Sequence, residues 1–161
     1  MKIAIIVHSL TGSTLRMAKL IESKLVKTGS LVTLFQLETN VPVATGSIHQ
    51  PMNFEITNLP DIADYDSVIA GGPVWGFCPS PVIYKAIKEL KALNGKRLLP
   101  FVTMGLPFRG MGGKNSIKHL SKAAAENGAI VLPGVIVSRG FNKFELNMEQ
   151  GAEECVNFFK H

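Results

Sequence analysis

A short run of small hydroxyl residues and glycine follows the first apolar segment of the chain. The segment Ile3-Ala4-Ile5-Ile6-Val7 is typical of a buried strand, and a helical pattern begins at Leu15. A turn of this kind directs unpaired backbone N–H groups, hydroxyl groups and the positive end of a helix dipole toward one point. The stretch therefore predicts a phosphate-binding loop made of Ser9, Leu10, Thr11, Gly12, Ser13 and Thr14.

This first loop lacks two well-known nucleotide-binding patterns. GxxxxGK[ST] is absent, so no lysine can reach a terminal phosphate, and GxGxxG is absent, which disfavours a dinucleotide bound on that fingerprint. The simpler alternative is an ordinary helix start, because Ser and Thr are common N-caps. Four hydroxyl residues and a glycine in six positions exceed what one cap needs.

The second candidate loop holds the only tryptophan of the chain. It follows an apolar segment, residues 67–70, and the pair Gly71-Gly72. Glycine and proline favour a stiff, closely fitting loop, and an indole placed there can cover a flat aromatic ligand. The alternative is that the indole packs over a strand end. The candidate residues are Pro73, Val74, Trp75, Gly76 and Phe77.

A third loop, residues 103–113, is rich in glycine. Its glycines would allow close backbone approach to a planar ligand, Phe108 would contact a ring, and Arg109 would offer positive charge to an anion. The alternative is a flexible turn before a helix. The candidate residues are Met104, Gly105, Phe108, Arg109, Gly110, Gly112 and Gly113.

Strand and helix patterns alternate along the chain and would position these loops. Apolar runs predict strands over 3–7, 31–37, 67–70, 98–104 and 130–137, and helical spacing predicts helices over 15–27, 82–93, 116–127 and 149–160. The alternation predicts an α/β three-layer sandwich around a doubly wound five-stranded parallel sheet. Ligands of such sheets bind at the carboxyl ends of the strands, and the three loops follow the first, third and fourth strands.

Residues 38–66 fit the alternation least well. Pro42, Pro51, Pro60 and Gly46 interrupt them, so we expect a long irregular connection with a short helix near 59–65. Long loops in compact domains are often functional. The chain shows no repeat and no linker, and we expect one domain over residues 1–161.

Composition narrows the class of protein. The 161 residues are 46% hydrophobic and 18% charged, which is typical of a globular chain. No apolar run approaches the roughly 20 residues that span a bilayer, and the start does not resemble a signal peptide. Cys78 and Cys155 have neither CxxC nor zinc-ligand spacing, so we expect no metal site and a cytoplasmic location.

The net charge of +5 favours acidic partners. Lysines recur along one face of two predicted helices, which indicates either solvated helix faces or a docking surface for an acidic protein. These lysines are Lys114, Lys118 and Lys122 in one helix and Lys85, Lys88 and Lys91 in the other. No nucleic-acid-binding motif accompanies them, so a nucleic-acid partner is not expected.

The three loops together resemble the flavodoxin-like FMN-binding proteins, in their short-chain flavodoxin and FMN-dependent reductase branches. Ser9-Leu10-Thr11-Gly12-Ser13-Thr14 is similar to the family's [ST]-x-T-G-x-T phosphate loop, and residues 66–75 and 102–113 are similar to its two isoalloxazine loops. The resemblance implies a sheet of order 2-1-3-4-5. It also implies that residues 9–14 hold the FMN phosphate while residues 73–77 and 104–113 border the ring.

The resemblance implies an electron-transfer protein in which FMN carries the chemistry, with no catalytic side chain. Its partner would be a redox protein. The first alternative is an FMN-dependent NAD(P)H:quinone-type oxidoreductase acting on a small acceptor. The second is a flavin-free binding or regulatory module on the same fold. The basic charge departs from that of typical acidic flavodoxins and favours an acidic redox partner.

Overall fold

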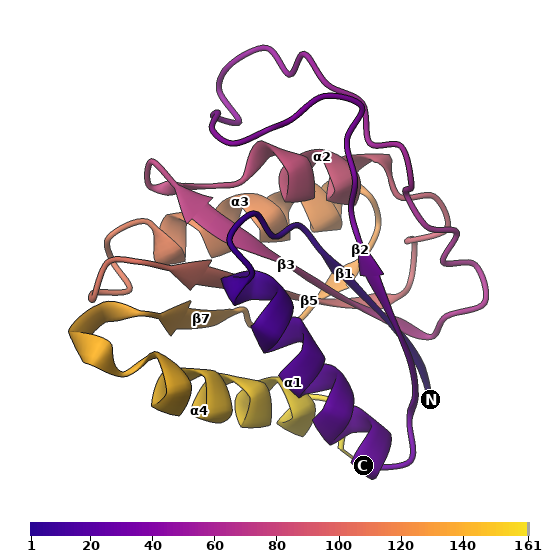
Figure 1. The fold of residues 1–161 in the computed structure, drawn as a ribbon. Helices are drawn as coiled ribbons and strands as arrows, with labels where there is room; N and C mark the ends of the chain where they lie inside the picture. The colour runs from indigo at the N-terminus through magenta and orange to yellow at the C-terminus, as the bar shows by residue number, and fades with distance from the viewer. Residues whose placement is uncertain (161) are drawn as a thin grey trace.

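A parallel sheet forms the centre of the molecule and helices cover both of its faces (Figure 1). The computed structural model describes residues 1–160. The strands are β1 (Lys2–Val7), β2 (Leu31–Gln36), β3 (Ser67–Trp75), β4 (Cys78–Pro79), β5 (Arg97–Met104), β6 (Ile130–Val131) and β7 (Val135–Ser138). The helices are α1 (Ser13–Lys27), α2 (Pro81–Glu89), α3 (Gly113–Glu126) and α4 (Phe144–Asn157), with a 3₁₀ turn, η1 (Gly140–Asn142), before α4.

The strand order β2-β1-β3-β5-β6 confirms the predicted doubly wound sheet. All pairs along this path are parallel, and β7 also pairs in parallel with β5. The predicted fifth strand, 130–137, is divided into β6 and β7, because Pro133 has no N–H for the ladder. The third strand is longer than predicted and turns back through Gly76 and Phe77 into the short antiparallel β4.

Alternate residues of β1 enter two separate cores. Ile3, Ile5 and Val7 pack with residues of α1 and α4 on one face. Ala4 and Ile6 pack with residues of α2 and α3 on the other face. All five side chains are fully buried. A strand buried on both faces is therefore an uninterrupted apolar run, as the sequence predicted.

Several predicted helix boundaries are wrong, including the end predicted at 160, since α4 ends at Asn157. The helix predicted over 82–93 ends at Glu89, because Leu90 has extended backbone angles. The predicted start at 116 lies three residues too late, since α3 begins at Gly113. The predicted start at 149 lies five residues too late, since α4 begins at Phe144. Within α4, the carboxylates of Glu149 and Glu153 pair with Lys24 of α1.

Residues 38–66 form the predicted long irregular connection, which lies beside α2 in Figure 1. Asn58 anchors it to β2: its Oδ1 accepts from the Glu38 amide at 2.7 Å, and its Nδ2 donates to the Gln36 carbonyl at 2.8 Å. The short helix predicted near 59–65 is absent. Asp61 Oδ1 instead accepts from the Ala63 amide, a side-chain turn that competes with helix formation.

Among residues 1–160, no helix combines the length and the hydropathy that a membrane span needs.

The centre of the sheet has no room for a larger residue at Gly71. An added Cβ would overlap the ring of Phe101, which is fully buried and cannot swing away. We expect Gly71→Ala to lower the free energy of unfolding by about 1–3 kcal/mol, measured by urea unfolding. Gly110→Ala is the control, because a Cβ there meets no atom within 4 Å, and it should change stability by less than ~0.5 kcal/mol. Equal stability of the two variants would contradict this packing.

Candidate functional site

A cleft of about 130 Å³ opens where the three predicted loops meet at the carboxyl edge of the sheet. Its walls come from the loop after β1, the end of β3 and the end of β5, with one residue from beyond β7. The lining residues are Leu10, Thr11, Ser13, Thr14, Pro73, Val74, Trp75, Thr103, Met104, Gly105 and Arg139. Segments far apart in the sequence thus share one site, as the strand-end rule predicted.

The N-terminus of α1 leaves two backbone N–H groups free in this cleft. Gly12 occupies the N-cap with a left-handed φ of 96°, and no side chain caps the helix there. Ser9 Oγ accepts from the amides of Gly12, at 3.2 Å, and Leu15, at 3.3 Å. The amides of Ser13 and Thr14 have no partner within residues 1–160. Free amides at the positive end of a helix dipole form a site for an anion.

The hydroxyl groups of the loop divide between structure and cleft. Thr14 Oγ1 lies 2.7 Å from Thr103 Oγ1 in a buried contact that ties α1 to β5. Ser9 is occupied by the loop's own amides. The hydroxyl groups that remain for a ligand in the cleft are those of Thr11 and Ser13.

His8 is a buried residue held between Ser80 and Trp75. Its Nδ1 lies 2.7 Å from Ser80 Oγ, and its ring meets the Trp75 ring edge-on, with centroids 5.4 Å apart. Ser80 also caps α2 by accepting from the Val82 amide. Burial lowers the pKa of His8 to about 4, so the imidazole is neutral at pH 7. This contact helps to hold the half-buried Trp75 at the cleft wall.

The third loop reaches the cleft only with Met104 and Gly105. Arg109 lines a separate cavity of about 290 Å³ between the loop, β7 and α4. Gly112 and Gly113 are packed against protein: a Cβ on Gly112 would lie 2.6 Å from Phe77 Cα, and one on Gly113 would lie 2.9 Å from Met104 Sδ. These two glycines therefore allow close packing between loops.

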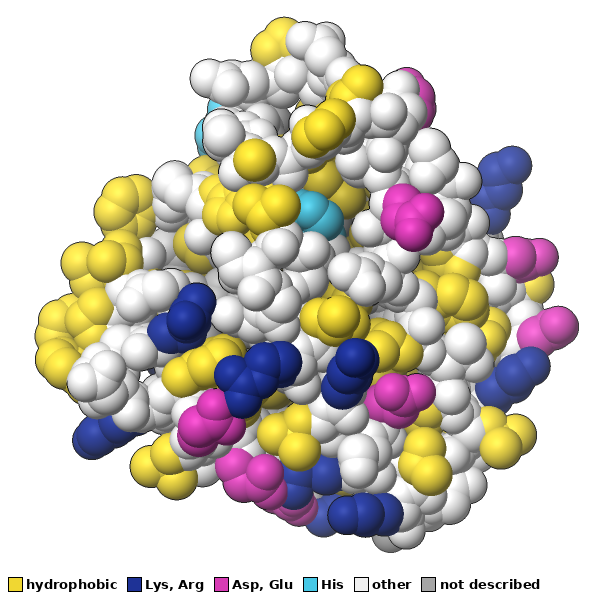
Figure 2. Space-filling model, viewed as in Figure 1, with side chains coloured by type: hydrophobic (Ala, Val, Ile, Leu, Met, Phe, Trp, Pro, Cys, Tyr) yellow, Lys and Arg dark blue, Asp and Glu magenta, His cyan; other side chains and the backbone are white. Residues whose placement is uncertain are grey.

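The other predicted residues surround the cleft. Ser9 and Gly12 shape the first loop, and Gly76, Phe77, Phe108 and Gly110 lie outside the lining. The edge nevertheless carries a rim of exposed apolar side chains, seen along the left side of Figure 2. We call this the apolar rim; it consists of Leu10, Phe77, Leu106, Phe108 and Phe141. Phe108 and Phe141 contact each other edge-on, with centroids 5.8 Å apart.

Two lining residues were not among the predicted site residues: Arg139, and Thr103, which was placed in the third loop without being named a candidate. Arg139 directly follows β7, so the strand-end rule would have found it had it been applied to the last strand. Its side chain is exposed, and its guanidinium lies 5.3 Å from the Phe144 ring. Thr103 lies inside an apolar strand and carries no comparable signal.

The sequence profile of the family described as NADPH-dependent FMN reductase matches residues 1–143. The chain belongs to this family. The match confirms the flavodoxin-like, FMN-binding family predicted from the three loops. A comparison of this chain with curated proteins found no significant match.

Solved flavodoxin structures share the fold of this FMN reductase family member. Flavodoxin 1 from Bacillus cereus is 23% identical, with a TM-score of 0.63 over 97% of this chain and 98% of that one. A flavodoxin from Streptococcus pneumoniae TIGR4 is 19% identical, with a TM-score of 0.62 over 98% and 99%. A flavoprotein from Lactobacillus acidophilus, solved in complex with FMN, is 20% identical, with a TM-score of 0.61 over 89% and 98%.

The buried His8 makes stability depend on pH. Its pKa is about 4 in the folded chain and near 6.5 when unfolded, so below pH 6.5 the unfolded chain binds a proton that the folded chain does not. Stability should therefore fall as the pH drops from 6.5 toward 4. We expect His8 to account for a loss of ~2 kcal/mol between pH 7.5 and pH 5, measured by urea unfolding. Over the same pH range, the His8→Asn variant should lose ~2 kcal/mol less stability than the parent chain. Identical pH profiles of the two proteins would refute the assignment.

Proposed function

We propose that the chain binds FMN non-covalently in this cleft and acts as an electron-transfer flavoprotein. The observation that carries the proposal is the meeting of the free Ser13 and Thr14 amides with Trp75 in one cleft. The amides suit a phosphate and the indole suits a flat ring. The residues present therefore fit the cofactor that the family match implies.

The cleft favours an anion electrostatically. No acidic side chain lines it, and Arg139 contributes a positive charge at its edge. The hydroxyl groups of Thr11 and Ser13 would add hydrogen bonds to the phosphate oxygens. Pro73, Val74, Trp75, Met104 and Gly105 would border the flavin ring, so the first loop would hold the charged end of FMN and the other two loops its flat end.

The role of this chain's residues would be binding and shielding. Bound FMN supplies the one- or two-electron chemistry. His8 is buried and neutral, and no carboxylate lines the cleft, so no lining side chain is a suitable proton donor or base. The apolar rim would exclude water from the cofactor edge and provide the contact surface for a redox partner, with basic surface groups favouring an acidic one.

A second candidate function is direct oxidation of NAD(P)H by bound FMN, followed by reduction of a small acceptor. The family match favours it. The exposed guanidinium of Arg139 and the cavity that contains Arg109 offer positive groups near the same edge for a second anionic ligand.

Two measurements test these functions. We expect the purified chain to bind FMN with a stoichiometry of one and to quench flavin fluorescence; absence of binding would support the flavin-free alternative.

The second measurement separates the carrier from the reductase. The holoprotein is mixed with NADPH alone. Slow oxidation, combined with rapid reduction by a partner reductase, is the result expected for an electron carrier. Rapid multiple turnover with a quinone acceptor would instead establish the reductase.

Arg139 should contribute to FMN affinity through its charge. We expect Arg139→Gln to weaken FMN binding about fivefold, which corresponds to ~1 kcal/mol for one partly solvated charge near a phosphate. The effect should shrink at high salt. Arg16→Gln is the matched control, because Arg16 also lies over the Phe144 ring, at 5.7 Å, but does not line the cleft. An equal loss in both variants, measured by fluorescence titration, would argue against the phosphate role.

A further inference from the structure

Three side chains with metal-binding atoms meet on the α2–α3 side of the molecule. His49 belongs to the long connection 38–66, Cys78 lies in β4, and His119 lies in α3. Their ligand atoms all lie within 4.8 Å of one another. Cys78 Sγ is 3.8 Å from His49 Nε2, and the two imidazole rings have centroids 5.6 Å apart at 78°. Within residues 1–160 no other group of three or more histidine, cysteine, aspartate or glutamate side chains brings its ligand atoms this close together.

These distances suit one small ion. With Zn–S near 2.3 Å and Zn–N near 2.0–2.1 Å, tetrahedral coordination requires S···N separations of about 3.6 Å and an N···N separation of about 3.3 Å. The observed separation of Cys78 Sγ and His49 Nε2 is 3.8 Å, close to the required value, and no pair of ligand atoms lies more than 4.8 Å apart, so side-chain rotation has to close the remaining gaps. Cys78 forms no disulfide, so its sulfur is available as a ligand.

The surroundings of Cys78 support a role as ligand. Asn115 of α3 donates from Nδ2 to the Phe77 carbonyl at 3.0 Å and lies 3.7 Å from Cys78 Sγ. Such a donor near the sulfur orients a thiolate ligand and stabilises its charge. Cys78 is buried, whereas His49 is exposed and His119 is half-buried. An ion can therefore enter from the solvent side.

We propose that His49, Cys78 and His119 bind one zinc ion. A thiolate with two imidazoles is a donor set that zinc accepts, and three protein ligands leave the fourth position for water or another ligand. This site is separate from the FMN cleft: it shares no residue with the cleft lining and does not depend on the proposed function.

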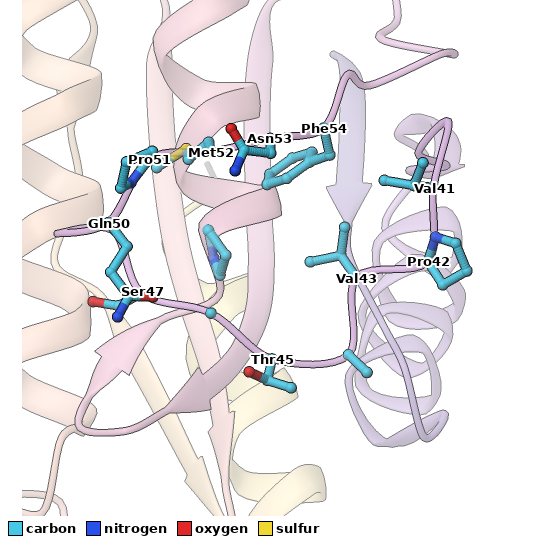
Figure 3. Close-up of a pocket in the computed structure, with 13 residues that line it drawn as sticks. Val41, Pro42, Val43, Thr45, Ser47, Gln50, Pro51, Met52, Asn53 and Phe54 are labelled. Atoms are coloured by element: carbon cyan, nitrogen blue, oxygen red, sulfur yellow. The ribbon is translucent and has the colours of Figure 1, made fainter.

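Metal binding would fasten the long connection to the sheet and to α3. His49 lies between Ser47 and Gln50, which line one side of a cavity of about 450 Å³. Figure 3 shows the chain curving around this cavity, with Val41 and Pro42 on the opposite side from Ser47 and Gln50. Zinc at His49 would hold the side of the cavity formed by Ser47 and Gln50 in place against β4 and α3.

The test is zinc titration of the untagged full chain with reduced thiols, in competition with a chromophoric chelator. We expect one zinc ion per chain and an increase in thermal stability with zinc. His119→Gln, His49→Gln and Cys78→Ser should each weaken binding by ~100-fold or more, beyond the loss expected for an outer-shell partner. Cys155→Ala is the matched control. Because Cys155 lies in the other core, this variant should bind zinc with the affinity of the parent chain.

Cobalt replaces zinc as a spectroscopic probe. The expected result is a thiolate-to-cobalt absorption band that Cys78→Ser abolishes and Cys155→Ala retains. Circular dichroism checks the fold of each variant, and if Cys78→Ser is unfolded, the two histidine variants decide. Absence of stoichiometric binding to the parent chain, or equal affinity in folded histidine variants, would overturn the proposal.

Discussion

Parallel pairing of β1, β3 and β5 determines where the functional loops of this chain can lie. Because these strands run parallel, the chain has to cross back to the starting edge of the sheet after each one, and all their carboxyl ends lie at the same edge. The close approach of β3 and β5 requires glycine at Gly71, against the Phe101 ring. The cleft proposed to bind FMN depends on this alignment, since the end of each strand or the loop after it contributes one wall.

Hydrogen bonding within the cleft decides which groups remain for a ligand. Ser9 satisfies two amides of its own loop, and Thr14 joins Thr103 across to β5. These bonds stabilise the loop without a cofactor and leave the amides of Ser13 and Thr14 without a partner among the described residues. For the proposed FMN site, a loop already ordered in this way would reduce the entropy cost of binding.

The long connection has a different basis for its order. It has few backbone–backbone hydrogen bonds, and asparagine side chains supply others. Asn58 accepts from the Glu38 amide and donates to the Gln36 carbonyl at the end of β2. Asn40 Oδ1 accepts from the Glu55 amide. The connection also carries His49, which meets Cys78 of β4 and His119 of α3 and is not part of the cleft lining. The same domain therefore presents two chemically distinct groups of side chains, one suited to an anion and a flat ring and the other to a thiophilic metal.

The sequence by itself determined the alternation of strands and helices and the three loops, because apolar periodicity and small turn residues act over a few neighbouring positions. The sheet order followed only from the family resemblance, and helix ends were placed poorly. The sequence did not reveal the contact of Thr14 with Thr103, the place of Arg139 or the meeting of His49, Cys78 and His119. Only the tertiary structure decided those features. They depend on contacts between residues tens of positions apart, such as Thr14 with Thr103, and local patterns carry no information about which distant partners will meet.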